Sequence, residues 1–207
     1  NMQAITDLIM YFHKGGLVMW PLLACSITVI AIAIERFIYY KSVDSGAAFA
    51  ARYCAAVRSG DFAVATELAR KGSGQCAQML ADVAAIAGGK EEKSAFLESR
   101  AGIFMATLRD KLDYLGIIVT MSPLLGLLGT IVGMIGAFSI FNVEAGAPMA
   151  ITGGIGEALI ATATGLCEAI LSLCAHSYFA HRMDNMITDM EQCFSALLEA
   201  ETRRARS

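Results

Sequence analysis

The stretch GGIGEALIATATGLCEAILS, residues 153–172, is apolar enough to lie in a lipid bilayer and yet carries two carboxylates. A charged side chain near the bilayer centre costs about 3 kcal/mol on insertion scales, so such residues usually face a protein interior or a wet cavity. On a helix, Glu157, Thr164 and Glu168 fall on one stripe. Helical rise places the two carboxylates about 16 Å apart along the axis. This layout predicts a membrane helix that lines an ion path.

The composition places the chain among membrane proteins with one substantial soluble part. Of 207 residues, 56% are hydrophobic and 17% are charged. The net charge of −3 and the lack of a basic, aromatic-interleaved patch give no reason to expect nucleic acid. The six cysteines are scattered without CxxC, so we interpret them as reduced residues, neither a disulfide framework nor a metal site.

Hydropathy and turn residues divide the chain into seven segments, all helical or turn, because no strand-like alternation occurs. We expect an amphipathic segment over 1–14, spans over 15–40, 112–141 and 151–180, a soluble helical domain over 41–111, a turn over 142–150 and a C-terminal helix over 181–207. Asp61 is the expected N-cap of a helix that begins at FAVATELARK. From about Glu91 a helical pattern continues to Pro123, which either kinks the span or is tolerated because neighbouring helices compensate.

The distribution of lysine and arginine sets the expected orientation. Of sixteen such residues, Lys14 alone precedes the first span or lies in the 142–150 turn. The remainder lie at the end of the first span, in the large loop or in the tail, which are therefore expected to be cytoplasmic. The N-terminus is then periplasmic and the C-terminus cytoplasmic.

Small residues in the second span indicate close helix packing. Glycines recur along MSPLLGLLGTIVGMIGAF, and small residues let membrane helices approach closely. The predicted packing positions are Gly126, Gly129, Gly133, Gly136 and Pro123.

Three stretches together resemble the ExbB/TolQ/MotA family of ion-driven motor subunits, in its three-span ExbB/TolQ branch. They are WPLLACSITVIAIAIERF, SPLLGLLGTIVGMIGAF and GGIGEALIATATGL, in that order and on either side of a large loop. The resemblance implies a homopentameric ring in the bacterial inner membrane, with long helices that continue into the cytoplasm. It implies a single-span ExbD/TolR-like partner with an intramembrane aspartate, and a TonB/TolA-like protein energised for outer-membrane transport or envelope maintenance.

Motif by motif, the resemblance also assigns residues to the ion path. Thr130 matches the threonine of LLGT, Glu157 the glutamate of GI-x-EAL and Thr162 the threonine of the following ATA. The family commonly continues its third span as GL-x-VAIPA, whereas this chain has GLCEAILS. Glu168 therefore replaces an apolar residue, and Leu171 stands where proline is usual.

Each candidate ion-path residue also has a structural interpretation. Glu157 is either a proton-exchanging group or a carboxylate that hydrogen-bonds a neighbouring subunit. Glu168 is either a second proton-relay or ion-selectivity group on the stripe with Thr164, or a structural side chain that reaches headgroup water or pairs with a basic residue. Thr130 and Thr162 either hydrate an ion or bond their own helix. The translocated ion is the proton, with sodium as the alternative, and we expect no cofactor and no enzymatic chemistry. The rival function is a non-conducting membrane scaffold.

Overall fold

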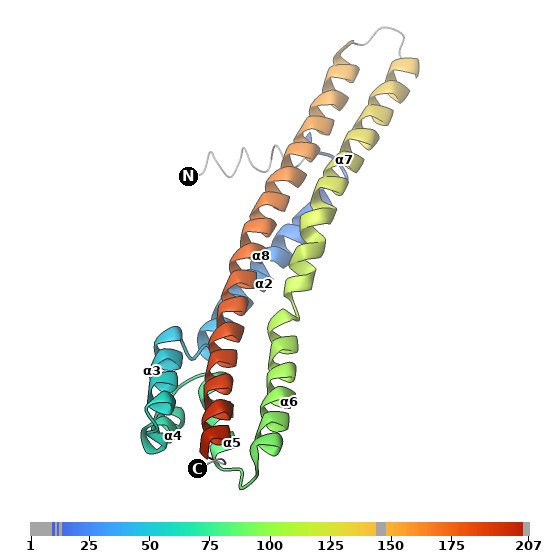
Figure 1. Ribbon diagram of the computed structural model, residues 1–207. Coiled ribbons are helices and arrows are strands. Elements are labelled where there is room, and N and C mark those ends of the chain that lie inside the picture. The colour runs from blue at the N-terminus through green and yellow to red at the C-terminus, as the bar shows by residue number, and fades with distance from the viewer. Residues whose placement is uncertain (1–9, 11, 13, 144–147, 205–207) are drawn as a thin grey trace. The chain divides into compact units, whose positions relative to one another are not determined.

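The computed structural model describes residues 10, 12, 14–143 and 148–204, with side chains outside 140–151. Its secondary structure in these ranges consists of helices joined by turns and short loops (Figure 1). The helices are α2 (Met19–Val43), α3 (Ala47–Arg58), α4 (Phe62–Lys71), α5 (Gln75–Ala84), α6 (Lys90–Arg109), α7 (Leu112–Val143) and α8 (Pro148–Arg204). Nearly all of the expected N-terminal segment and part of the 142–150 turn lie outside the described residues. The expectation of an all-helical chain is confirmed for the described part.

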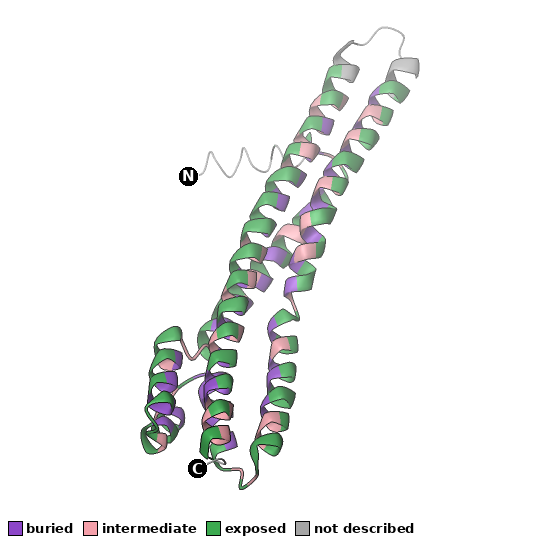
Figure 2. Ribbon diagram, viewed as in Figure 1, coloured by how far each residue is buried: buried purple, intermediate pink, exposed green. Residues whose placement is uncertain are grey.

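Three helical stretches of the described chain are long and apolar enough to cross a membrane, and they include α2, α7 and the first half of α8. Large apolar side chains on these helices are exposed, for example Ile30, Leu127 and Leu159. Figure 2 shows exposed positions alternating with buried and intermediate ones along α7 and α8. A soluble protein rarely exposes so much apolar surface, so these faces suit lipid or neighbouring subunits. The expectation of three spans agrees with this arrangement.

The chain divides into two compact units, each described here by itself. The span unit comprises the described part of residues 1–34 together with residues 113–177. The loop unit comprises residues 35–112 and the described residues from 178 onward. Within the span unit, α7 lies beside the first half of α8 (Figure 1).

The loop unit is a set of short helices around a buried core. Side chains that are almost fully buried include Tyr40, Leu80, Val83, Leu108 and Met190. The carboxylate of Asp61 accepts a hydrogen bond from the Val64 N–H at 3.1 Å, so the predicted N-cap of α4 is confirmed.

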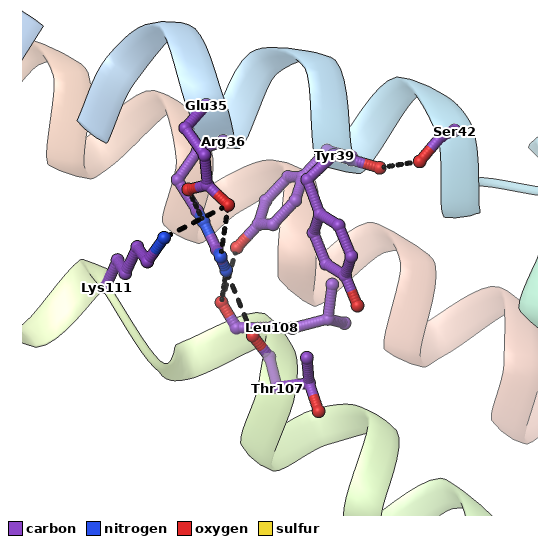
Figure 3. Close-up of polar contacts among 8 residues, drawn as sticks. Glu35, Arg36, Tyr39, Ser42, Thr107, Leu108 and Lys111 are labelled. Atoms are coloured by element: carbon purple, nitrogen blue, oxygen red, sulfur yellow. Dashed lines mark hydrogen bonds and ion pairs between the residues drawn. The ribbon is translucent and has the colours of Figure 1, made fainter. Parts of the chain in front are cut away.

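The helical pattern from Glu91 ends earlier than predicted, at the end of α6, and α7 begins at Leu112. Figure 3 shows the reason. The buried Arg36 guanidinium donates to the carbonyl of Thr107 at 3.0 Å, and the Tyr40 hydroxyl donates to the carbonyl of Leu108 at 2.8 Å. These partners satisfy carbonyls that a continuing helix would otherwise use.

The Arg36 side chain is itself held by an ion pair. Its Nε lies 2.8 Å from the carboxylate of Glu35, which also lies 3.3 Å from Lys111 Nζ (Figure 3). Pro123, by contrast, does not end a helix, because α7 runs through it. A proline can be accommodated in a membrane helix when neighbouring helices and side chains satisfy the freed backbone groups.

Candidate functional site

One face of α8 carries the polar stripe into the interior of the span unit. Glu157 and Thr164 are half-buried, Ala161 is fully buried and Glu168 is 6% exposed. The residues between them that point away, such as Leu159 and Leu166, are exposed apolar side chains. The period of α8 thus separates a lipid-compatible face from a polar interior face, and both carboxylates lie on the latter.

Glu157 lies against the turn that precedes α2. Gly16 adopts a positive φ of 73°, and a Cβ at this position would collide with the Glu157 carboxylate. Glycine therefore serves two purposes here: it permits the turn, and it leaves room for the carboxylate. Local sequence pattern could not predict this contact, since Gly16 and Glu157 are about 140 residues apart.

The three predicted threonines use their hydroxyl protons on backbone carbonyls. Thr130 donates to Leu127 at 2.6 Å and Thr164 to Ile160 at 2.8 Å, each within its own helix. Thr162 lies 3.2 Å from the carbonyl of Ala158 and also 3.2 Å from that of Gly126 on α7. Each hydroxyl oxygen keeps lone pairs with which it can accept a hydrogen bond from water. These hydroxyls thus bond to the backbone, as the structural interpretation expects. Their oxygen lone pairs still remain available to accept hydrogen bonds.

Backbone contact between α7 and α8 is made at glycines. A Cβ at Gly126 would lie 3.1 Å from the Cα of Thr162, and one at Gly133 would lie 3.0 Å from the carbonyl oxygen of Gly154. Gly129 has no room for a Cβ beside the Ala161 methyl. A Cβ at Gly136 would meet nothing within 4 Å among the residues whose side chains are described, so no such contact is seen at Gly136 in this part of the chain.

The second carboxylate, Glu168, ends in a buried polar centre that we call the Glu168 centre: Ser26, Ser122, Glu168 and Ser172. Ser122 and Ser172 are fully buried, and Ser26 and Ser122 are the hydroxyl neighbours of the carboxylate. Within the described residues, neither oxygen of Glu168 nor the Oγ of Ser122 or Ser172 has a hydrogen-bond partner. Ser26 lies on α2 and Ser122 on α7, so local sequence pattern could not predict that they meet Glu168 on α8.

Three cysteines lie in the core of the loop unit. Cys54 Sγ lies 3.9 Å from Cys193 Sγ, and Cys76 interacts with Cys193. All are buried free thiols. Burial raises the pKa of Cys54 to about 11, and the hydrogen bond with Cys76 together with burial raises that of Cys193. A thiol with a raised pKa is a poor nucleophile, so these residues serve packing.

The described part of the chain contains no cluster of metal-ligating side chains. No group of three or more His, Cys, Asp or Glu side chains there could hold a metal ion. The polar features of the span unit are single carboxylates and hydroxyls, which suit the passage of protons or hydrated cations rather than a bound transition metal.

Comparison with known proteins agrees with this arrangement. Residues 69–192 match the model of the MotA/TolQ/ExbB proton channel family. The protein named ExbB-like 1 of Synechocystis sp. is 33% identical over 78% of this chain and 66% of its own length. Biopolymer transport protein exbB1 of Vibrio cholerae is 27% identical over 85% of this chain and 80% of its own. The Tol-Pal system protein TolQ of Pseudomonas aeruginosa is 36% identical over 39% of this chain and 35% of its own.

Proposed function

Because the chain belongs to the MotA/TolQ/ExbB proton channel family, we propose that it is the ring subunit of an inner-membrane motor driven by the proton motive force. In this proposal five copies surround the span of an ExbD/TolR-like partner that bears an intramembrane aspartate. Ion flow through the assembly energises a TonB/TolA-like protein. The chain itself performs no covalent chemistry.

The observation that carries the proposal is the position of Glu157 on the interior stripe of α8. Residues 113–177 contain no lysine or arginine, so α7 and this part of α8 offer Glu157 no partner of either kind; Lys14, two residues before Gly16, is the one such residue in the sequence of the span unit. The carboxylate is half-buried, and it lies beside Gly16. An ionisable side chain inside a membrane span usually marks an ion path or a proton relay.

The hydroxyls of Thr130, Thr162 and Thr164 extend the polar path along α7 and α8. Their protons are already donated to carbonyls, so their free lone pairs can accept hydrogen bonds from water molecules that carry protons. The exposed apolar faces of the spans supply the surface on which neighbouring copies and lipid would pack.

The proposed orientation of the chain in the membrane follows from the distribution of its positive charges. The loop unit carries nearly all the lysines and arginines, which supports a cytoplasmic location for it and a periplasmic N-terminus. A cytoplasmic loop unit also suits its buried free thiols, since the cytoplasm keeps thiols reduced.

A substitution at Glu157 tests the proposal. Glu157→Gln keeps the size and the hydrogen-bonding oxygen of the side chain but cannot ionise, so the ring should assemble while motor-dependent uptake or envelope maintenance is lost. Glu157→Asp should retain part of the activity. Glu191→Gln, an exposed position on the same helix, serves as the matched control and should behave as wild type. Full activity of Glu157→Gln in an assembled ring would instead favour a non-conducting scaffold.

A further inference from the structure

A second acidic group lies inside the span unit, in the Glu168 centre. Glu168 is 6% exposed, and Ser122 and Ser172 are 0% exposed. Helix α2 contributes Ser26, α7 contributes Ser122, and α8 contributes the other two residues. The hydroxyls of Ser26 and Ser122 lie close enough to interact with the carboxylate, but within the described residues no hydrogen bond of normal geometry joins them. Buried polar groups in this state are rare in folded proteins and need an explanation.

The negative charge of an ionised Glu168 would have no fixed counterpart in its surroundings. The sequence has no lysine or arginine over residues 15–35 or 112–181, which include the parts of α2, α7 and α8 in the span unit. A buried ion without a partner costs several kcal/mol even after the structure relaxes. In practice such a group is neutralised, either by a proton or by a bound cation.

Other titratable groups near the centre cannot supply that positive charge. On α2 the titratable neighbour is Cys25, whose thiol is neutral or negative. Helix α7 carries no charged residue from Tyr114 to Val143. On α8, Cys167 points to the exposed side and Glu157 lies eleven residues earlier, while His176 lies at the level of Gly116. The described surroundings of Glu168 are thus apolar, hydroxylic or acidic.

Packing at this level favours the proton over a metal cation. A Cβ at Gly165, one turn before Glu168, would lie 2.5 Å from the Ser122 carbonyl oxygen and 3.1 Å from the Cα of Gly126. The backbones of α7 and α8 therefore touch beside the carboxylate. A bound sodium ion needs a cavity into which several oxygens converge, whereas a proton adds no volume. A protonated carboxyl can also donate to the hydroxyl of Ser26 or Ser122 after a small side-chain rotation.

We propose that Glu168, with the hydroxyls of Ser26, Ser122 and Ser172, forms a proton-binding centre in each subunit, in which the carboxyl group is protonated at neutral pH. It is separate from Glu157, which lies about 16 Å away along α8. The proposal concerns what this carboxyl binds, so it stands whether or not Glu157 lies on the path of the driving ion.

Infrared spectroscopy of the full chain in lipid bilayers tests this directly, because a protonated carboxyl has a C=O stretching band that a carboxylate lacks. The chain has 19 aspartates and glutamates, so spectra of matched variants must be subtracted. At neutral pH, Glu168→Gln should lack one protonated carboxyl band per subunit relative to wild type. Glu191→Gln, at an exposed position, should lose none.

Further measurements keep the test decisive if Glu168→Gln does not fold. The double variant Ser26→Ala/Ser122→Ala retains the carboxyl but removes both hydroxyls to which a protonated Glu168 can donate, so the band should move to higher frequency. Exchange of potassium chloride for sodium chloride should leave the band unchanged. The proposal is overturned if wild type shows no such band at neutral pH, if the band is insensitive to the double substitution, or if sodium abolishes it.

Discussion

Substitution of Gly165 by alanine should separate α7 from α8, and the structure sets the size of the effect. The new methyl carbon would lie 2.5 Å from the Ser122 carbonyl oxygen, whereas ordinary contact begins at 3.4 Å. The atoms it meets belong to the backbone of α7 and cannot rotate away, so the helices must part by about 1 Å. Overpacking of this kind costs about 1–3 kcal/mol.

Alanine also favours the helical state over glycine by up to about 1 kcal/mol, which partly offsets that cost. Gly153→Ala isolates this contribution, because a Cβ at Gly153 on the same helix would meet nothing within 4 Å. The free energy of unfolding of Gly165→Ala should therefore fall about 1–3 kcal/mol below that of Gly153→Ala.

Titration of the detergent-solubilised protein with a denaturing detergent provides the assay, with fluorescence of the single tryptophan, Trp20 on α2, as the signal from the span unit. The close contact of α7 with α8 would be refuted if the two alanine variants unfold at the same detergent concentration, or if Gly165→Ala is the more stable.

Two further predictions concern the loop unit. Arg36→Met removes the donor to the Thr107 carbonyl, so the free energy of unfolding, measured by thermal unfolding with circular dichroism, should fall by about 1.5–3 kcal/mol. The variant Arg70→Met, at an exposed position, should lose little, and equal losses would contradict the capping role of Arg36. Burial raises the pKa of Cys54 to about 11, so this thiol stays protonated to a higher pH in the folded state than in the unfolded state. The free energy of unfolding should therefore be constant below the ordinary thiol pKa of about 8.5 and fall as pH rises towards 11. Cys54→Ala should make that decline shallower, and an identical decline in both proteins would show that other groups cause it.

The spans and the polar stripe could be predicted because each depends on one local stretch of sequence. Hydropathy and length identify α2, α7 and the first half of α8, and helical periodicity places Glu157 and Glu168 on one interior face. The Asp61 cap was predictable for the same reason, since an N-cap is a contact over three residues.

Features that depend on contacts between distant segments could not be predicted from local pattern. The end of α6 at Arg109 is explained by contacts with Arg36, about 70 residues earlier. The meeting of Ser26 and Ser122 with Glu168 depends on the rotation of three helices about their axes. Ala137, next to Gly136, lies against Gly154 of α8, whereas a Cβ at Gly136 would meet no described atom within 4 Å.

Native mass spectrometry of the complex, extracted gently from its own membrane, tests the central claim most directly. The account predicts a ring of five copies of this chain that retains a small single-span protein with one intramembrane aspartate. A ring that carries no such partner under the same gentle conditions would contradict the motor and favour a membrane scaffold.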